Sequence, residues 1–459
     1  MNRTVVINVV GLTKDLIGEN TPSLSHFMKT GEFHFLSSIF PLVTCSVQAS
    51  FTTGLMPRDH GCVANGWYFR NLSEIFFWKQ SNKLVCGEKI WEAAKKIRQD
   101  FTCANLFWWY NMYSSVDFSV TPRPMYPADG RKIPDIYTEP ASLRQELNHA
   151  LGQFPLFHFW GPKADIISSE WIAQASQTVF EKYHPSLTLI YLPHLDYNLQ
   201  RLGPQNLRIQ EDLRKIDSIC GKLINFFQEQ NTRIILLSEY GIAPVCKAIH
   251  INRLLREEKY IRTREELGLE ILDPGASEAF AVADHQIAHV YVKNPNRVQE
   301  VRKLLEKCPG IEAILGEKEQ AEYGVNHPNS GELIAIAEKD AWFTYYYWLE
   351  DRKAPDFART VDIHRKPGYD PVELFLNPQI FFPIMKIAWK LILKKMGFRT
   401  LLDVISLDSG LVKGSHGRYP LSPSCGPVFM TNTKGLIPEE TVHATDVKRY
   451  ILQHIFDKI

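Results

Sequence analysis

Buried strands alternate with amphipathic helices along much of the chain. Continuous apolar runs at Val5–Val10, Leu187–Leu192 and Arg233–Leu237 are typical of strands covered on both faces. Between the last two, apolar residues recur at helical spacing from Ile209 to Phe226, which predicts an amphipathic helix. This alternation predicts an α/β fold with a mostly parallel sheet and helices on both of its faces.

Weaker sequence signals predict further helices and a strand in the N-terminal part of the chain. Pro22, with Thr21 before it, indicates the start of a helix, and Thr44 heads a second one. A further helix is expected over 88–98 and a strand over 102–108. These elements continue the same alternation of strand and helix.

The pattern changes between about residues 255 and 345. A charged helix is followed by a strand over 288–292, a helix over 297–306 and a strand over 332–337. We expect residues 256–345 to form a smaller inserted α+β lobe. The core is then made of residues 1–255 together with residues 346–459.

The composition and the balanced charge indicate that any binding of an anion depends on a local site. The 459 residues are 45% hydrophobic, which is enough for a large core, and 52 basic side chains are balanced by 51 acidic ones. Such a chain has no overall field that would attract nucleic acid. We therefore expect no nucleic-acid partner and only a local site for any anion, whereas the oligomeric state stays open.

The eight cysteines show no CxxC pair and no zinc-finger spacing. We expect reduced, mostly buried thiols rather than a disulfide framework. The sequence before Val5 has no room for a signal peptide, and we expect a cytoplasmic location.

A basic amphipathic helix is predicted within residues 380–393. Pro383, Lys386 and Lys390 interrupt the apolar run, so it is not a transmembrane helix. Lys386, Lys390 and Lys394 recur every four residues along one face. Two interpretations stay open: the helix packs on its own domain, or it makes weak contact with a membrane surface.

The candidate chemistry lies at a strand-to-helix turn in residues 40–48. A hydroxyl at the first turn of a helix, here that of Thr44, meets free N–H groups and the positive end of the helix dipole, which favour a phosphate. Asn65, twenty-one residues later, is a neutral hydrogen-bond donor. The alternative is that Thr44 only caps the helix.

Three motifs in residues 41–68 carry a resemblance to a known family. Pro-x-x-Thr, Thr-Gly-Leu-x-Pro-x-x-His-Gly and Asn-Gly-Trp-Tyr resemble the type I phosphodiesterase and nucleotide pyrophosphatase family of the alkaline phosphatase superfamily. The resemblance implies an alkaline-phosphatase-like fold and a hydrolase that acts on phosphoric ester or phosphoanhydride bonds. It also implies that Thr44 attacks phosphorus, giving a phosphothreonine intermediate, and that Asn65 holds a phosphoryl oxygen.

The resemblance further implies divalent metals, usually two zinc ions. Asp196 and His416 match ligand positions by identity, and Glu239 stands where the family has Asp. At the other three ligand positions this chain has Val10, Gln200 and Tyr240, of which Val10 offers no donor at all. We expect a divalent metal, zinc, with one or two ions, held by Asp196, Glu239 and His416.

Replacement ligands, a single metal, or binding without cleavage would each account for these departures. Asp362 and His364 alternate along an extended stretch and are assigned as further metal ligands, although a structural pair is the other interpretation. Asp284 and His285 are also available donors, or simply a turn. The rival function is a non-catalytic family member that binds a phosphorylated metabolite or a lipid headgroup.

Aromatic side chains are frequent after Asn65, at Trp67–Phe69, Phe76–Trp78 and Trp108–Tyr110. Core packing accounts for most of them. A few could form a stacking wall for a nucleobase or a slot for an apolar leaving group, and both alternatives stay open.

Overall fold

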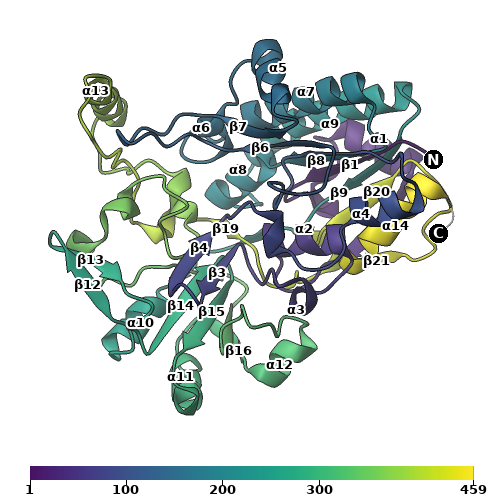
Figure 1. Cartoon of the computed structure of the whole chain (residues 1–459). Coiled ribbons are helices and arrows are strands. Elements are labelled where there is room, and N and C mark those ends of the chain that lie inside the picture. The colour runs from purple at the N-terminus through teal and green to yellow at the C-terminus, as the bar shows by residue number, and fades with distance from the viewer. Residues whose placement is uncertain (458–459) are drawn as a thin grey trace.

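A nine-stranded sheet lies at the centre of the computed structural model, which describes residues 1–457 (Figure 1). Its strands run in the order β21-β2-β20-β9-β1-β8-β5-β6-β7. They comprise β1 (Thr4–Val9), β2 (Glu32–Ser37), β5 (Cys103–Leu106), β6 (Phe118–Pro122), β7 (Ile136–Glu139), β8 (Leu187–Leu192), β9 (Arg233–Leu237), β20 (Val428–Thr431) and β21 (Thr441–His443).

The middle of this sheet is parallel and fully buried. Val5 of β1 pairs with Thr188 of β8 on one side and with Ile234 of β9 on the other, both in parallel register. All six residues of β1 and of β8 are buried, which is why these strands are continuous apolar runs in the sequence. Antiparallel pairs occur where β20 meets β2 and β9 and where β7 meets β6. The predicted fold class is confirmed.

Helices cover both faces of the sheet (Figure 1). One face carries α1, α5, α7 and α9, and the other carries α2, α4 and α14. The helices are α1 (Pro22–Thr30), α2 (Thr44–Thr53), α3 (Pro57–His60), α4 (Ile90–Ile97), α5 (Ser142–Leu151), α6 (Leu156–Phe159), α7 (Ile166–Tyr183), α8 (His194–Leu202), α9 (Ile209–Glu229), α10 (Ile251–Glu257), α11 (Val298–Leu305), α12 (Glu317–Glu322), α13 (Pro383–Lys395) and α14 (Val447–Phe456).

A smaller four-stranded antiparallel sheet, in the order β14-β15-β17-β16, forms a second layer of structure below the central one (Figure 1). Its strands are β14 (Ala279–Asp284), β15 (Ile287–Val292), β16 (Ile311–Leu315) and β17 (Leu333–Ala337). Its apolar cluster also takes in Phe77, Ile249 and Tyr369, from outside residues 256–345. The domain boundary at 256–345 stays a prediction.

Four two-stranded pairings, with strands of two to four residues, lie outside these two sheets. Hairpins are formed by β3 with β4 and by β12 with β13, and isolated pairs by β10 with β19 and β11 with β18. The strands are β3 (Gly66–Phe69), β4 (Glu74–Phe77), β10 (Ala243–Pro244), β11 (Lys247–Ile249), β12 (Thr263–Glu266), β13 (Leu269–Leu272), β18 (Ala341–Phe343) and β19 (Gly414–Ser415).

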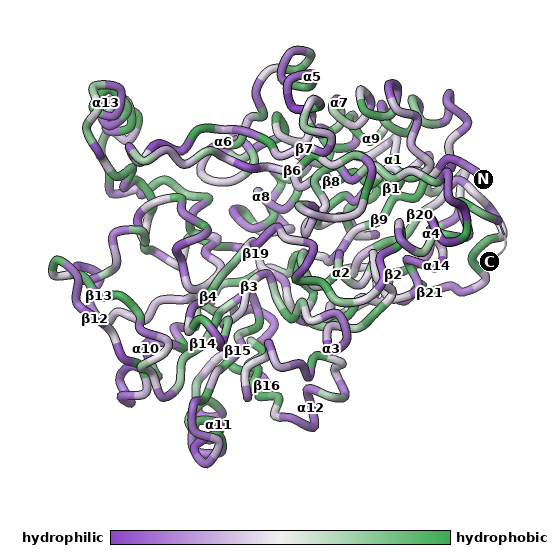
Figure 2. Tube along the Cα trace, in the orientation of Figure 1, coloured by the Kyte–Doolittle hydropathy of each residue, from purple (hydrophilic) through white to green (hydrophobic). Residues whose placement is uncertain are grey.

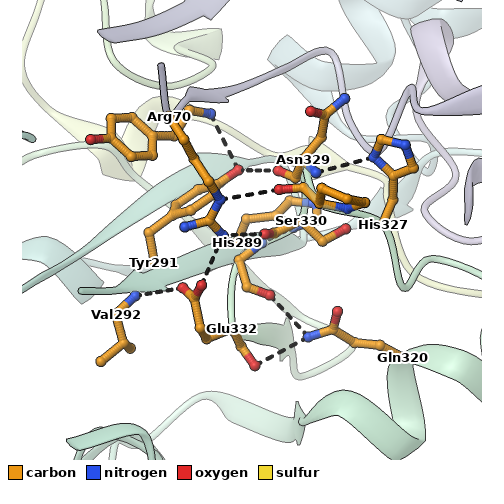
Figure 3. A network of polar contacts seen from close by, with 12 residues as sticks. Arg70, His289, Tyr291, Val292, Gln320, His327, Asn329, Ser330 and Glu332 are labelled. Atoms are coloured by element: carbon orange, nitrogen blue, oxygen red, sulfur yellow. Dashed lines mark hydrogen bonds and ion pairs between the residues drawn. The ribbon is translucent and has the colours of Figure 1, made fainter. Parts of the chain in front are cut away.

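A polar network fixes the lobe to the β3–β4 hairpin (Figure 3). Arg70, just after β3, donates from Nε to the Pro328 carbonyl at 3.1 Å and forms an ion pair with Glu332 at 2.9 Å. Tyr291 of β15 accepts a hydrogen bond from the Tyr68 N–H and donates one to the Asn329 carbonyl. The lobe is thereby held against the segment that carries Asn65.

Helix α13 stands apart from both sheets, at the upper left of Figure 1. It mixes hydrophobic and hydrophilic residues (Figure 2), and none of its thirteen residues is buried. Across residues 1–457, no helix has the length and apolar character needed to cross a membrane. All eight cysteines are free thiols, and four of them are buried, namely Cys45, Cys62, Cys103 and Cys220.

Candidate active site

Thr44 is the first residue of α2 and lies beyond the carboxyl ends of the central strands. Val43 is the N-cap, and the Thr44 hydroxyl makes no capping hydrogen bond. Its Oγ1 instead lies 3.1 Å from the Tyr240 hydroxyl, and the side chain is almost completely buried. The capping interpretation of Thr44 is therefore wrong, since the hydroxyl faces the site rather than the helix backbone.

Asn65 is fixed beside Thr44 by three hydrogen bonds. Its Oδ1 accepts the N–H of Cys45, the residue after Thr44, at 3.0 Å. Its own N–H and Nδ2 donate to the two carboxylate oxygens of Asp284, at 2.7 and 3.1 Å. The second Nδ2 hydrogen makes no hydrogen bond among residues 1–457.

Asp284 is the last residue of β14, so the four-stranded sheet contributes a side chain to the site beside Thr44. Burial raises the pKa of its carboxyl group to about 7, and the two hydrogen bonds from Asn65 oppose this rise. From the sequence, Asp284 was expected to be only a spare metal ligand or part of a turn. Its contacts show a carboxylate that orients Asn65.

Asp196 lies in the first turn of α8, after β8. Its Oδ2 accepts a hydrogen bond from the Gln200 amide at 2.7 Å, and its Oδ1 accepts one from the Tyr240 hydroxyl at 3.4 Å. Burial raises its pKa to about 7, while the Gln200 and Tyr240 bonds lower it. Tyr240 therefore bridges the Thr44 hydroxyl and the Asp196 carboxylate.

Glu239 follows β9 and is held by two neutral amides. Asn8 of β1 and Gln48 of α2 donate to its Oε1 at 2.6 and 2.5 Å. Its Oε2 is buried without a hydrogen-bond partner in the described part of the chain, and burial raises the pKa of the carboxyl group to about 8. Sequence reasoning missed Asn8 and Gln48, although a lone Asn within the apolar run of β1 was a usable signal.

Four rings form a stacked column behind Thr44. The rings of Tyr240 and His416 lie 3.5 Å apart and almost parallel, those of His416 and His285 lie 3.7 Å apart, and those of His285 and Tyr369 lie 3.8 Å apart. The Tyr369 hydroxyl donates to Gln200, which ties the column to Asp196.

The two histidines of this column are held neutral. Burial lowers the pKa of His416 to about 3 and that of His285 well below its usual value. His416 Nδ1 lies 2.7 Å from the Leu42 carbonyl and donates to it, so its Nε2 carries a free lone pair. Neither His416 Nε2 nor His285 Nδ1 has a hydrogen-bond partner among residues 1–457.

Asp362 and His364 line the cavity that Thr44 also lines. No hydrogen bond or ion pair joins their side chains to Asp196, Glu239 or His416 within residues 1–457. Their assignment as metal ligands stays a prediction.

The donors around Thr44 do not fit the two-ion site that the resemblance implies. Tyr240 and Gln200 place a neutral phenol and a neutral amide at ligand positions, and both engage Asp196 in hydrogen bonds. Glu239 is satisfied at Oε1 by the two amides, and Val10 is apolar and buried. In the part of the chain that the structure describes, no group of three His, Cys, Asp or Glu side chains is placed to bind one ion.

The site opens into a cavity of about 1170 Å³. Thr44, Asp196 and Tyr240 line one end, and residues of α13 line the other. Seven basic side chains line the cavity, at Lys79, Arg123, Arg131, Lys132, Lys163, Lys394 and Lys395, against three acidic ones, at Asp129, Asp196 and Asp362. The balanced chain thus has a local excess of positive charge where an anionic substrate would enter.

Aromatic rings form one wall of this cavity. The rings of Trp78 and Trp109 lie 4.8 Å apart, and that of Trp160 lies 5.6 Å from Tyr369. Trp67, in contrast, is buried and stacks on Phe69. Trp78 and Trp109 are therefore the members of the predicted aromatic group that face the cavity.

A buried ion cluster supports the loop that carries Tyr369. Lys366 Nζ lies 2.6 Å from Asp370 and 2.8 Å from Glu373, and all three side chains are buried. Burial lowers the Lys366 pKa, but the two carboxylates more than offset this effect and the net pKa is raised, so the ammonium stays charged. Glu373 also accepts hydrogen bonds from the Trp160 indole and the Asp362 N–H.

Known proteins resemble this chain in sequence and in fold. It is 26% identical over 263 residues to an uncharacterized pyrophosphatase/phosphodiesterase of Schizosaccharomyces pombe, covering 55% of this chain and 46% of that protein. It is 24% identical over 252 residues to human ectonucleotide pyrophosphatase/phosphodiesterase family member 1, covering 52% of this chain and 23% of the relative. The chain thus spans less than half the length of these curated relatives.

Solved structures share the fold over nearly the whole chain. Murine ectonucleotide pyrophosphatase/phosphodiesterase 5, an inactive form in complex with AMP, has a TM-score of 0.60 at 15% identity and covers 100% of this chain and 96% of its own. Phosphonoacetate hydrolase from Sinorhizobium meliloti, in complex with phosphonoformate, has a TM-score of 0.61 at 13% identity and covers 99% and 96%. The model of the type I phosphodiesterase / nucleotide pyrophosphatase family matches residues 4–370. Because this match spans most of the sequence and both Thr44 and Asn65, the chain belongs to the type I phosphodiesterase / nucleotide pyrophosphatase family.

Proposed function

We propose that this chain hydrolyses a phosphoester or phosphoanhydride bond with Thr44 as the nucleophile. The observation that carries the proposal is that hydrogen bonds hold Asn65 beside Thr44, which lines a cavity with seven basic side chains. The Cys45 N–H and Asp284 hold Asn65 in place, so its amide needs no reorganisation to meet a phosphoryl oxygen.

The reaction begins with attack of Thr44 Oγ on phosphorus. As that bond forms, the bond from phosphorus to the leaving oxygen breaks, and the leaving group departs into the cavity. The Thr44 proton has a path through the Tyr240 hydroxyl, 3.1 Å away, to Asp196, a further 3.4 Å away. Water then attacks phosphorus and the bond from phosphorus to Thr44 Oγ breaks. Oγ regains a proton, and phosphate or a phosphomonoester is released. The positive end of α2 and Asn65 stabilise the phosphoryl oxygens throughout.

The substrate class is a small phosphorylated compound. Seven basic side chains around the cavity favour an anion, and the murine and bacterial structural neighbours were solved with AMP and phosphonoformate. A cytoplasmic location remains a prediction that the fold does not address.

The second candidate function is binding of a phosphorylated ligand without turnover. The observation that favours it is the presence of Tyr240 and Gln200 at two ligand positions, where their hydrogen bonds occupy the carboxylate oxygens of Asp196. Two measurements separate the hydrolase from the binding protein. One is the hydrolysis of bis(4-nitrophenyl) phosphate, and the other is the binding of AMP by calorimetry. Slow turnover that depends on Thr44 supports the hydrolase, whereas AMP binding with no product supports the binding protein.

We predict that the purified protein holds at most one divalent ion per chain, bound through Asp196 and His416. Val10, Gln200 and Tyr240 remove one carboxylate and two imidazoles from the six family ligands, so affinity for a second ion is poor. Metal analysis with occupancy counted per chain measures this, with Asp196→Asn/His416→Ala as the depleted variant. Two fully occupied ions in anomalous diffraction would contradict it and would point to Asp362, His364, Asp284 or His285 as ligands.

Asn65→Ala is expected to lower the turnover number about 10²–10³-fold, the usual effect of removing one preorganised oxyanion donor. Asn65→Asp is the comparison variant, because it keeps the acceptor for the Cys45 N–H, loses the donor and adds a negative charge beside Asp284. Both variants should be slow in steady-state kinetics. Wild-type turnover of the Asn65→Asp variant would contradict the proposed role of Asn65 in binding a phosphoryl oxygen, and would leave Asn65 with a structural role only.

A further inference from the structure

The segment 381–401 exposes an unusual density of large hydrophobic side chains. Helix α13 and its flanks expose Phe381, Phe382, Ile384, Met385, Trp389, Leu391, Ile392, Met396, Phe398 and Leu401. Phe381 and Ile384 are 91% and 78% exposed, and elsewhere in residues 1–457 exposed hydrophobics are scattered along the chain. A contiguous exposed apolar surface of this kind marks an interaction site.

Positive charge accompanies this apolar surface. Residues 380–402 contain Lys386, Lys390, Lys394, Lys395 and Arg399 and no Asp or Glu. Asp403 forms ion pairs with Lys386 and Lys390, at 3.0 and 3.1 Å, whereas no ion pair involves Lys394 or Lys395 within the described residues. The helix therefore combines apolar side chains with an uncompensated basic charge.

The same helix lines the cavity that ends at Thr44. Ile387, Leu391, Lys394 and Lys395 contribute to the lining from α13, and Leu402 and Val404 continue it. Phe157 and Tyr126 also line the cavity and are half exposed to solvent. The cavity thus extends from α13 to the nucleophile, and apolar and basic side chains line it together.

We propose that α13 lies on an anionic lipid bilayer and that the cavity binds an amphiphilic phosphoester, whose apolar chain lies along α13 and whose phosphate reaches Thr44. An exposed apolar face with flanking lysines suits a bilayer that bears negative headgroups. The isolated position of α13 at one end of the molecule leaves this face accessible (Figure 1). Cleavage of the amphiphile rests on the proposed function, whereas the bilayer contact and ligand binding do not.

Vesicle co-sedimentation tests the bilayer contact. The protein should sediment with vesicles of phosphatidylcholine and phosphatidylglycerol, less with phosphatidylcholine alone, and less at high salt. Met385→Glu/Trp389→Glu should reduce the bound fraction at least tenfold without changing the melting temperature, because both side chains are exposed. Leu72→Glu/Leu207→Glu, at exposed leucines elsewhere, is the matched control and should bind like the wild type.

Absence of vesicle binding, or equal losses in the two double variants, would overturn the bilayer contact. A dimer in sedimentation equilibrium that Met385→Glu/Trp389→Glu dissociates, without vesicle binding, would assign the surface to a second copy of the chain and overturn it too.

Calorimetry with dodecyl phosphate, below its micelle concentration, and with methyl phosphate tests the ligand class. Dodecyl phosphate should bind at least tenfold more tightly, and Ile387→Asp/Leu391→Asp should remove this difference. Equal affinities in the wild type would overturn the amphiphile. These binding measurements need no turnover, so a protein that binds both vesicles and dodecyl phosphate but hydrolyses nothing would refute only the proposed hydrolase.

Discussion

Thr44→Ala is expected to abolish phosphodiester hydrolysis, with a loss of at least about 10⁴-fold in the turnover number, because the proposed covalent step has no other nucleophile. The fold should be spared. The hydroxyl makes no capping bond, and its loss removes one hydrogen bond to Tyr240, which costs about 1 kcal/mol. Hydrolysis of a nitrophenyl diester and the melting temperature measure the two effects.

Thr44→Ser is the matched control for this prediction. It keeps the attacking oxygen and loses only a methyl group, so it should retain measurable turnover and form a phosphoserine that mass spectrometry detects. Retention of most of the activity by Thr44→Ala would exclude Thr44 as the nucleophile.

Lys366→Met is expected to lower the free energy of unfolding by about 3–5 kcal/mol, since it leaves the buried carboxylates of Asp370 and Glu373 without their cation. We expect the loop that carries Tyr369 to become less ordered in this variant. The stacked rings of Tyr369, His285, His416 and Tyr240 should then become less ordered as well. Chemical denaturation followed by tryptophan fluorescence measures the change.

Lys386→Met provides the comparison, because its ion pair with Asp403 is about one-third exposed on both sides. Exposed pairs contribute about 0–1 kcal/mol, so this variant should unfold almost like the wild type. Equal destabilisation by the two substitutions would show that the Lys366 cluster contributes no more than a surface pair.

The sequence alone predicted the parallel middle of the central sheet, but not the strands at its edges. The predicted strands at Leu187–Leu192 and Arg233–Leu237 match β8 and β9, because strands buried on both faces must be apolar throughout. The helix from Ile209 was recovered because one apolar stripe packs on the sheet. The turn and helix start at Thr44 could be predicted from the sequence, because residues close in sequence determine both.

The contacts that hold the site together appear only in the folded chain. Asp284 lies 219 residues from Asn65, and Glu239 meets Asn8 and Gln48 from two other elements, so no local spacing could reveal these contacts. The exposure of α13 could not be predicted from the sequence either. An amphipathic helix has the same sequence pattern whether its apolar face packs on a core or lies on a membrane. Local chemistry fixed which residues can act, and long-range packing decided which of them meet.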